Sequence, residues 1–421
     1  MDETSATRIP TEFQLHEHII QDFHYPSNKM GGISGTGQKI ANILAAIYFD
    51  INSVCQARKI ANQMPDLVNI NRYRWECQGA GALVSQAVAL ALNPANSLSH
   101  EKDKYQQEPQ RLAQLISRVG WKIVSICAHS EAFRRACKES ETHVWDGVVG
   151  QIDANRLSIE LFARTRNLEW RGPLLKHARH SLSELQREFA PYRKLCGEHP
   201  HHFVRTMDGA IRQPIYEGYP QVHINKCIFD PKDWEGEEDE NGQITNPTIR
   251  YEDDGDCDLC GSEQICSCAP ISLSGQLVEL MDYPGKGVGV RALANFQKGS
   301  ILDEFVGVIY PPNYEDYVYS ASIHSQQQAE QEEIATISPK RYGNWTRFLN
   351  HSCNASCVFR ELVIGDRIIL AVEAVRDICI LEEITVHYGD NYWTGGRKCQ
   401  CGAANCSSLD TRTGTSTPSS D

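Results

Sequence analysis

Hydrophobic residues in the first half of the chain recur every three or four positions, which is the spacing of an amphipathic α-helix. One such stripe covers residues 40–47 and a second covers 83–92. A third, over 175–189, follows Pro173, and proline suits the first position of a helix. We therefore predict a mostly α-helical N-terminal domain over residues 1–205, whose role the pattern does not indicate.

After residue 270 the pattern changes to short runs rich in Val and Ile and separated by Gly and Pro, which is typical of β-strands. These runs are 276–280, 301–310, 368–372 and 384–387. They predict a β-rich domain over residues 271–395. The tail at 408–421 is polar and of low complexity, and we expect it to be disordered.

The composition is that of a globular protein, with 41% hydrophobic and 23% charged residues over 421 positions. This excludes a fibrous or wholly disordered chain, and the length predicts two or three domains. The longest apolar runs are shorter than the roughly 20 residues that span a bilayer, so we expect no membrane partner. The net charge of −13 does not favour direct nucleic-acid binding, which depends on Lys and Arg, and fits a basic protein partner.

Much of this negative charge lies in the segment between the two predicted domains, at residues 206–270. From Asp230 to Asp258 there are twelve carboxylates and only two cations, Lys232 and Arg250. Acidic runs are usually solvated surface, and that interpretation stays open here. The alternative is that the segment attracts a basic protein.

The cysteines are unevenly distributed along the chain. Of sixteen, five lie singly in the first 200 residues, where we expect buried thiols. Four others fall within twelve residues, at Cys257, Cys260, Cys266 and Cys268. Four thiolates at this spacing can form a tetrahedral zinc site, with Cys227 as a possible substitute ligand.

A second cysteine cluster lies in the segment 396–407. Cys399, Cys401 and Cys406 supply three thiolates, and a tetrahedral zinc ion needs a fourth ligand from elsewhere in the chain. The alternative is a reduced, cysteine-rich turn without metal. Zinc is favoured because closely spaced cysteines in a chain without a secretory signal indicate metal ligands rather than disulfides.

Three further motifs lie in the β-rich region. A glycine-rich loop runs from Gly285 to Gly289, and its glycines allow the backbone to approach a ligand closely. The sequence Asn-His-Ser-Cys occupies 350–353, and Glu-Glu-Ile-Thr-Val-His-Tyr occupies 382–388. Alone, each would fit an ordinary hairpin, polar loop or strand.

In this order, and with the cysteine tail, these motifs resemble those of the SET-domain protein lysine methyltransferases over about 270–407. The preceding cysteine-rich segment is similar to a reduced pre-SET segment, and the tail to a post-SET zinc segment. The resemblance implies a multidomain chain in which the helical domain precedes a β-rich, β-clip-like SET domain flanked by zinc-bound segments.

The resemblance also assigns residues. It implies that S-adenosylmethionine is the methyl donor, held by Lys286, Gly287, Gly289, Asn350 and His351. Trp393 is a candidate wall of the pocket, and a place in the core is the alternative. Tyr388 matches the catalytic tyrosine of the family. Cys353 matches the fourth zinc ligand, beside the three tail cysteines.

The predicted function is therefore an S-adenosylmethionine-dependent protein lysine N-methyltransferase, in the nucleus and on chromatin, with histone tails as substrate. Two alternatives remain: methylation of a non-histone protein, and a SET-fold chromatin scaffold with weak activity. Phe305 stands where many members of the family have a tyrosine, and Val386 occupies a position, often Phe or Tyr in the family, that bears on how many methyl groups are added. The target lysine and the oligomeric state are not indicated.

Overall fold

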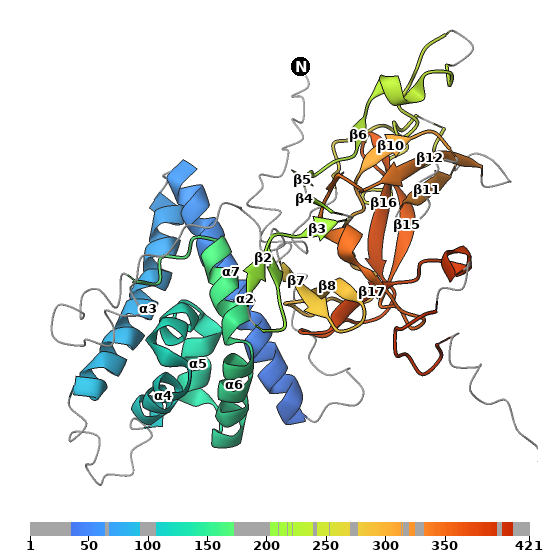
Figure 1. The fold of residues 1–421 in the computed structure, drawn as a ribbon. Coiled ribbons are helices and arrows are strands. Elements are labelled where there is room, and N and C mark those ends of the chain that lie inside the picture. The colour runs from blue at the N-terminus through green and yellow to red at the C-terminus, as the bar shows by residue number, and fades with distance from the viewer. Residues whose placement is uncertain are drawn as a thin grey trace, which may run out of the picture.

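The structure is a computed structural model that describes residues 35–63, 67–92, 107–171 and 203–406. The last range has gaps at 209, 217, 221, 239–241, 252, 270–276, 313, 315–319, 325–331 and 394–397. Figure 1 shows a group of helices on one side and a β-rich part on the other, as the hydrophobic pattern predicts.

The helices form a domain built around one central helix, and we call α2–α7 the helical domain. Its elements are α2 (Gly35–Gln63), α3 (Leu67–Leu92), α4 (Gln107–Cys127), α5 (Glu131–Glu139), α6 (Thr142–Ala154) and α7 (Arg156–Thr165). Helix α2 packs against α3, α5 and α6. The stripes predicted at 40–47 and 83–92 lie in α2 and α3, whereas the stripe at 175–189 lies outside the described residues.

Helix α2 is also long and apolar enough to cross a membrane by length and composition alone. Its residues Ile47 and Ile51 are fully buried among the other helices. A core helix passes the same test of length and composition, so this is weak evidence for a membrane segment.

The largest sheet has the strand order β2-β1-β7-β8-β17-β15-β16-β9, with β14 paired to β17. Its strands are β1 (Val204–Arg205), β2 (Ile211–Arg212), β7 (Val278–Tyr283), β8 (Gly287–Ala292), β9 (Ile301–Glu304), β14 (Asn350–His351), β15 (Cys357–Ile364), β16 (Arg367–Ala374) and β17 (Glu383–Val386). The four runs predicted as strands each overlap a strand here or in the second sheet. The sheet begins at Val204, just before the domain boundary predicted at residue 205.

A second sheet has the order β11-β12-β10-β6. Its strands are β6 (Ile228–Phe229), β10 (Val308–Tyr310), β11 (Ala321–His324) and β12 (Glu333–Ser338). Two short pairs accompany it, β5 (Val222–His223) with β13 (Tyr342–Gly343) and β3 (Ile215–Tyr216) with β4 (Tyr219–Pro220). Since β1, β5 and β6 pair with strands from beyond residue 277, the segment after residue 203 is part of the β-rich fold.

The acidic segment is more ordered than a solvated run. The 3₁₀-helix η4 (Pro231–Trp234) places Trp234 in a buried cluster, where its indole nitrogen donates to the Ile309 carbonyl at 3.1 Å. Arg250, predicted as one of two cations among the carboxylates, is 1% exposed. The Trp234 contact and the bond from Arg250 to the Gly365 carbonyl hold the segment against the β-rich part.

Candidate functional site

The glycine loop is the turn between β7 and β8. Gly285 and Gly287 have φ of 74° and 82°, a region that residues with a Cβ rarely adopt. At Gly289 the reason for glycine is space, since a Cβ would lie 2.5 Å from Nδ2 of Asn350 and 2.7 Å from Cδ2 of Tyr283. The absence of a side chain at Gly289 therefore allows β8 to lie in close contact with Asn350.

Two of the predicted cofactor residues meet at one carboxylate. Lys286 Nζ lies 2.7 Å from Oε2 of Glu383, and Asn350 Nδ2 donates to Oε1 at 3.0 Å. The motif at 382–388 contains Glu383, but the sequence alone predicted no role for this residue. The sequence did carry a hint of such a role. Successive side chains of a strand point to opposite faces, so Glu383 lies on the face opposite to that of its buried neighbour Ile384.

Asn350 and His351 form β14, which runs parallel to β17 with His351 opposite Val386. This pairing brings the chain after β17 back to the Asn-His pair. The backbone N–H of Tyr388 donates to Nδ1 of His351 at 3.2 Å, and the Tyr388 hydroxyl donates to the Leu349 carbonyl at 2.6 Å. The proton of the hydroxyl is therefore engaged, and its oxygen can act only as an acceptor.

His351 connects the predicted cofactor residues to the tail cysteines. Burial, together with the charge of His387, lowers the pKa of His351 to about 4, so its ring is neutral at pH 7. Because Nδ1 accepts from Tyr388, the ring proton is on Nε2, which lies 3.4 Å from Sγ of Cys353. In this tautomer the Nε2–H of His351 donates to Cys353.

The residues at this site fit a nucleoside cofactor with polar edges. Among the described residues, no hydrogen-bond partner is found for the buried Tyr283 hydroxyl or for the buried indole nitrogen of Trp393. Trp393, in the 3₁₀-helix η7 (Asp390–Trp393), packs edge-on against His351 with ring centroids 4.7 Å apart. Buried polar atoms normally have a partner, so these two groups are free to bind a ligand.

The tail cluster combines Cys353 with the cysteines predicted beside it. The ligand atoms of Cys353, Cys399, Cys401 and His351 all lie within 4.8 Å of one another, and Cys353 Sγ is 3.8 Å from Cys399 Sγ. The fourth predicted ligand, Cys406, interacts through its thiol with those of Cys399 and Cys401. Burial opposes the Cys401 thiolate, but the N–H groups of Cys353 and Ala403 outweigh it and lower its pKa to about 6.

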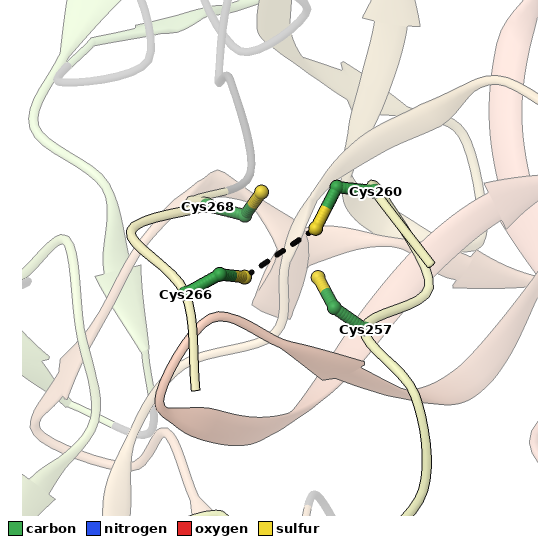
Figure 2. Close-up of side chains that lie close together, drawn as sticks. All are labelled: Cys257, Cys260, Cys266 and Cys268. Atoms are coloured by element: carbon green, nitrogen blue, oxygen red, sulfur yellow. Dashed lines mark hydrogen bonds between the residues drawn. The ribbon is translucent and has the colours of Figure 1, made fainter. Parts of the chain in front are cut away.

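The other predicted cluster brings all four of its cysteines together, and we call residues 257–268 the four-cysteine loop. Figure 2 shows Cys257, Cys260, Cys266 and Cys268 with their sulfur atoms turned toward one another. These sulfurs lie within 4.8 Å of one another, and Cys260 and Cys266 are 3.5 Å apart. Burial opposes the Cys257 thiolate, yet the N–H groups of Gly365, Leu259 and Cys260 lower its pKa to about 6. Four convergent sulfurs, one of them readily ionised, suit zinc.

The four-cysteine loop is attached to the turn between β15 and β16. Asp258 N donates to the Val363 carbonyl at 2.8 Å, and Val363 N donates to Oδ2 of Asp258 at 2.7 Å. A Cβ on Gly365 would lie 2.2 Å from the Cys268 carbonyl oxygen, so only glycine allows this contact. The loop is therefore docked on the β-rich domain.

The remaining sequence candidates lie apart from these clusters. Cys227 donates to the Phe305 carbonyl at 3.9 Å, and burial raises its thiol pKa to about 12, so it is not placed as a ligand of the four-cysteine loop. Phe305 is buried against Phe359, with ring centroids 5.0 Å apart. Val386 is fully buried in the core.

Comparison with known proteins agrees with the motifs. The family model described as the SET domain matches residues 287–389, which confirms the predicted SET domain. A SET domain-containing protein of Phaeosphaeria nodorum is 30% identical over 238 residues, covering 49% of this chain and 36% of that protein.

Two relatives carry more specific names. An H3 lysine-36 specific histone-lysine N-methyltransferase of Cryptococcus neoformans is 24% identical, and the match covers 44% of this chain and 25% of that protein. The H3 lysine-9 specific histone-lysine N-methyltransferase SUVH1 of Nicotiana tabacum is 32% identical, and the match covers 35% of this chain and 24% of that protein. The chain thus spans about a quarter to a third of the length of these relatives.

Proposed function

We propose that this SET-domain chain is an S-adenosylmethionine-dependent protein lysine N-methyltransferase that acts on histone H3. The observation that carries the proposal is the meeting of Lys286 and Asn350 at Glu383, beside a tyrosine hydroxyl whose proton is already engaged. The SET domain found at 287–389 supports the reaction class. The relatives named for H3 lysine-36 and H3 lysine-9 support the substrate class.

The chemistry asks little of the protein beyond positioning. When bound, S-adenosylmethionine supplies an activated methyl group that a neutral amine can displace in line. A substrate lysine with a pKa near 10.4 must first lose a proton, which an apolar environment favours. The oxygen of Tyr388 can then accept a hydrogen bond from the amine and orient its lone pair.

Holding the cofactor is assigned to Lys286, Gly287, Gly289, Asn350 and His351, with Trp393 as a wall. The Tyr283 hydroxyl, for which the described part of the chain offers no hydrogen-bond partner, is a further candidate for this group. Zinc is assigned to the four-cysteine loop and to Cys353, Cys399, Cys401 and Cys406. Each zinc would fasten a loop with few core residues of its own to the β-rich domain.

The substrate proposal also uses charge. Glu235, Glu237 and Glu238 are exposed and follow directly after the buried Trp234. A basic histone tail is attracted by such a surface, in a manner that weakens as salt is raised. Activity on histones would place the protein in the nucleus, on chromatin.

The test is transfer of radiolabelled methyl groups from S-adenosylmethionine to recombinant histone H3 and to a cell extract. We expect label in H3, and its loss when the target lysine is replaced by alanine, with lysine-9 and lysine-36 replaced first. Label confined to other proteins would identify a non-histone substrate. Cofactor binding without any transfer would identify a SET-fold scaffold, and would overturn the proposal.

A further inference from the structure

The helical domain is connected to the β-rich domain by a buried chain of hydrogen bonds. The Tyr48 hydroxyl on α2 donates to Oγ of Ser158 on α7 at 2.8 Å, and Ser158 donates to Oε2 of Glu279 on β7 at 2.8 Å. Glu279 also accepts from Nε of Arg291 on β8, at 2.6 Å. Tyr48, Ser158 and Glu279 are at most 2% exposed, so water does not compete for these bonds.

Apolar side chains surround these hydrogen bonds in the contact between the two domains. One continuous hydrophobic cluster contains residues of the helical domain, such as Ile47 and Ile159, together with Val278 and Val290 of the sheet. A buried carboxylate is costly unless its oxygens are paired. Glu279 is paired from both sides, with Arg291 and, at 3.8 Å, Arg205 within the sheet, and with Ser158 from the helical domain.

The register of the sheet places Glu279 in line with the predicted cofactor residues. Arg291 lies opposite Glu279 on one side and opposite Glu383 on the other. Directly opposed residues of antiparallel strands share one face of the sheet, so these three form a row. Gly289 is two residues before Arg291 on the same strand, and Glu383 is the carboxylate that holds Lys286 and Asn350.

We propose that the helical domain positions the cofactor-binding hairpin β7–β8, and that Ser158 is the positioning residue that does so through Glu279 and Arg291. This inference rests on the proposed function. A hairpin fixed in advance does not have to be ordered when the cofactor binds, which improves affinity. Tyr388 follows a different strand, so the loss of Ser158 weakens cofactor binding more than it slows the chemical step.

The test compares two serines of the helical domain. Ser125 is as buried as Ser158, and its hydroxyl donates to the Trp170 carbonyl at 2.6 Å, within the helical part of the chain. Ser158→Ala and Ser125→Ala each remove one buried hydroxyl, but Ser158→Ala breaks two hydrogen bonds, those with Tyr48 and Glu279, whereas Ser125→Ala breaks one. We therefore expect both full-length variants to lose melting temperature, Ser158→Ala more than Ser125→Ala. Only Ser158→Ala should raise the Kd for S-adenosylmethionine, measured by calorimetry, by at least about fivefold.

Kinetics supply a second readout. In Ser158→Ala the KM for S-adenosylmethionine should rise with the Kd, while kcat stays within about twofold of the unchanged chain. Tyr48→Phe, which keeps the ring but loses the hydroxyl, should also raise the Kd for S-adenosylmethionine, by a smaller factor than Ser158→Ala. This variant serves where Ser158→Ala does not fold.

The outcomes separate the two proposals. An unchanged Kd in both network variants, or an equal rise in Ser125→Ala, would mean that Ser158 contributes only stability, and would overturn the inference. A wild-type chain that binds no S-adenosylmethionine would overturn the proposed function before any variant is compared.

Discussion

The guanidinium of Arg250 donates to the main-chain carbonyl of Gly365 at 3.1 Å, and so joins the chain just before the four-cysteine loop to the β15–β16 turn. The same side chain donates to four carbonyls within its own segment, those of Gly255, Ser262, Glu263 and Gln264. One buried cation thus gathers the chain around the four cysteines. Its acceptors are neutral carbonyls, and the guanidinium has enough donors to serve several of them.

Replacing Arg250 by Lys should therefore destabilise the protein although the charge is kept. An ammonium has three donors on one atom and cannot reach carbonyls spread around a planar guanidinium. Each buried carbonyl left without a donor costs about 1–3 kcal/mol. We expect a fall of at least about 2 kcal/mol in the free energy of unfolding, measured by urea denaturation.

A matched control is Arg212→Lys, since Arg212 is a partly exposed residue that pairs with Asp282 at 2.7 Å. Pairs of this kind contribute at most about 1 kcal/mol. Equal losses in the two variants would contradict the role given to Arg250.

Metal analysis checks the two cysteine clusters. We expect about two zinc ions per chain, as two tetrahedral sites require. Cys260→Ser and Cys401→Ser should each lower this to about one, because each removes one thiolate from a different cluster. Cys227→Ser should leave the zinc content unchanged, since its thiol faces the Phe305 carbonyl. A chain without zinc would mean that both clusters are reduced cysteines.

The fourth ligand of the tail cluster can be tested separately. Nδ1 of His351 accepts from the Tyr388 N–H, which leaves the ring proton between Nε2 and Cys353. Cys406→Ser should therefore release the tail zinc, and His351→Gln should retain it. Retention in Cys406→Ser with loss in His351→Gln would make His351 the ligand.

The local features of this molecule are those that the sequence could predict. The cysteines from Cys257 to Cys268 are close neighbours in the chain, so their spacing alone indicated a cluster. Helical and strand patterns are local too, and α2, α3 and β16 lie where periodicity placed them.

The features that were missed depend on contacts between distant residues. Arg250 was counted as a cation in a solvated run, yet one of its side-chain acceptors is the carbonyl of Gly365, 115 residues later. Ser158 and Glu279 are 121 residues apart, and Lys286 and Glu383 are 97 apart. No periodicity indicates such pairs, because they follow from the register of the sheet and from the packing of the helical domain.

Tyr388→Phe tests the catalytic assignment. The ring would keep its contacts with Tyr392 and His351, so the Kd for S-adenosylmethionine should stay nearly unchanged. The hydroxyl that can accept from the substrate amine would be lost. We expect turnover to fall at least about tenfold, equivalent to roughly 1.4 kcal/mol, in single-turnover methyl transfer. Near-normal turnover would remove Tyr388 from the reaction.

The close contact at Gly289 gives a prediction about cofactor affinity. In Gly289→Ala the new methyl group would meet the Asn350 amide and the Tyr283 ring, so one of them must move. Overpacking of this kind costs about 1–3 kcal/mol, and displacing Asn350 also breaks its bond to Glu383. We expect the Kd for S-adenosylmethionine to rise at least about tenfold.

Gly150→Ala is the control for this substitution. Gly150 lies in α6, where a Cβ would meet no atom of another element within 4 Å, and alanine favours a helix over glycine by about 1 kcal/mol. It should therefore raise the melting temperature and leave the Kd unchanged. If Gly289→Ala bound the cofactor as tightly as Gly150→Ala, then the approach of β8 to Asn350 would not be part of the cofactor site.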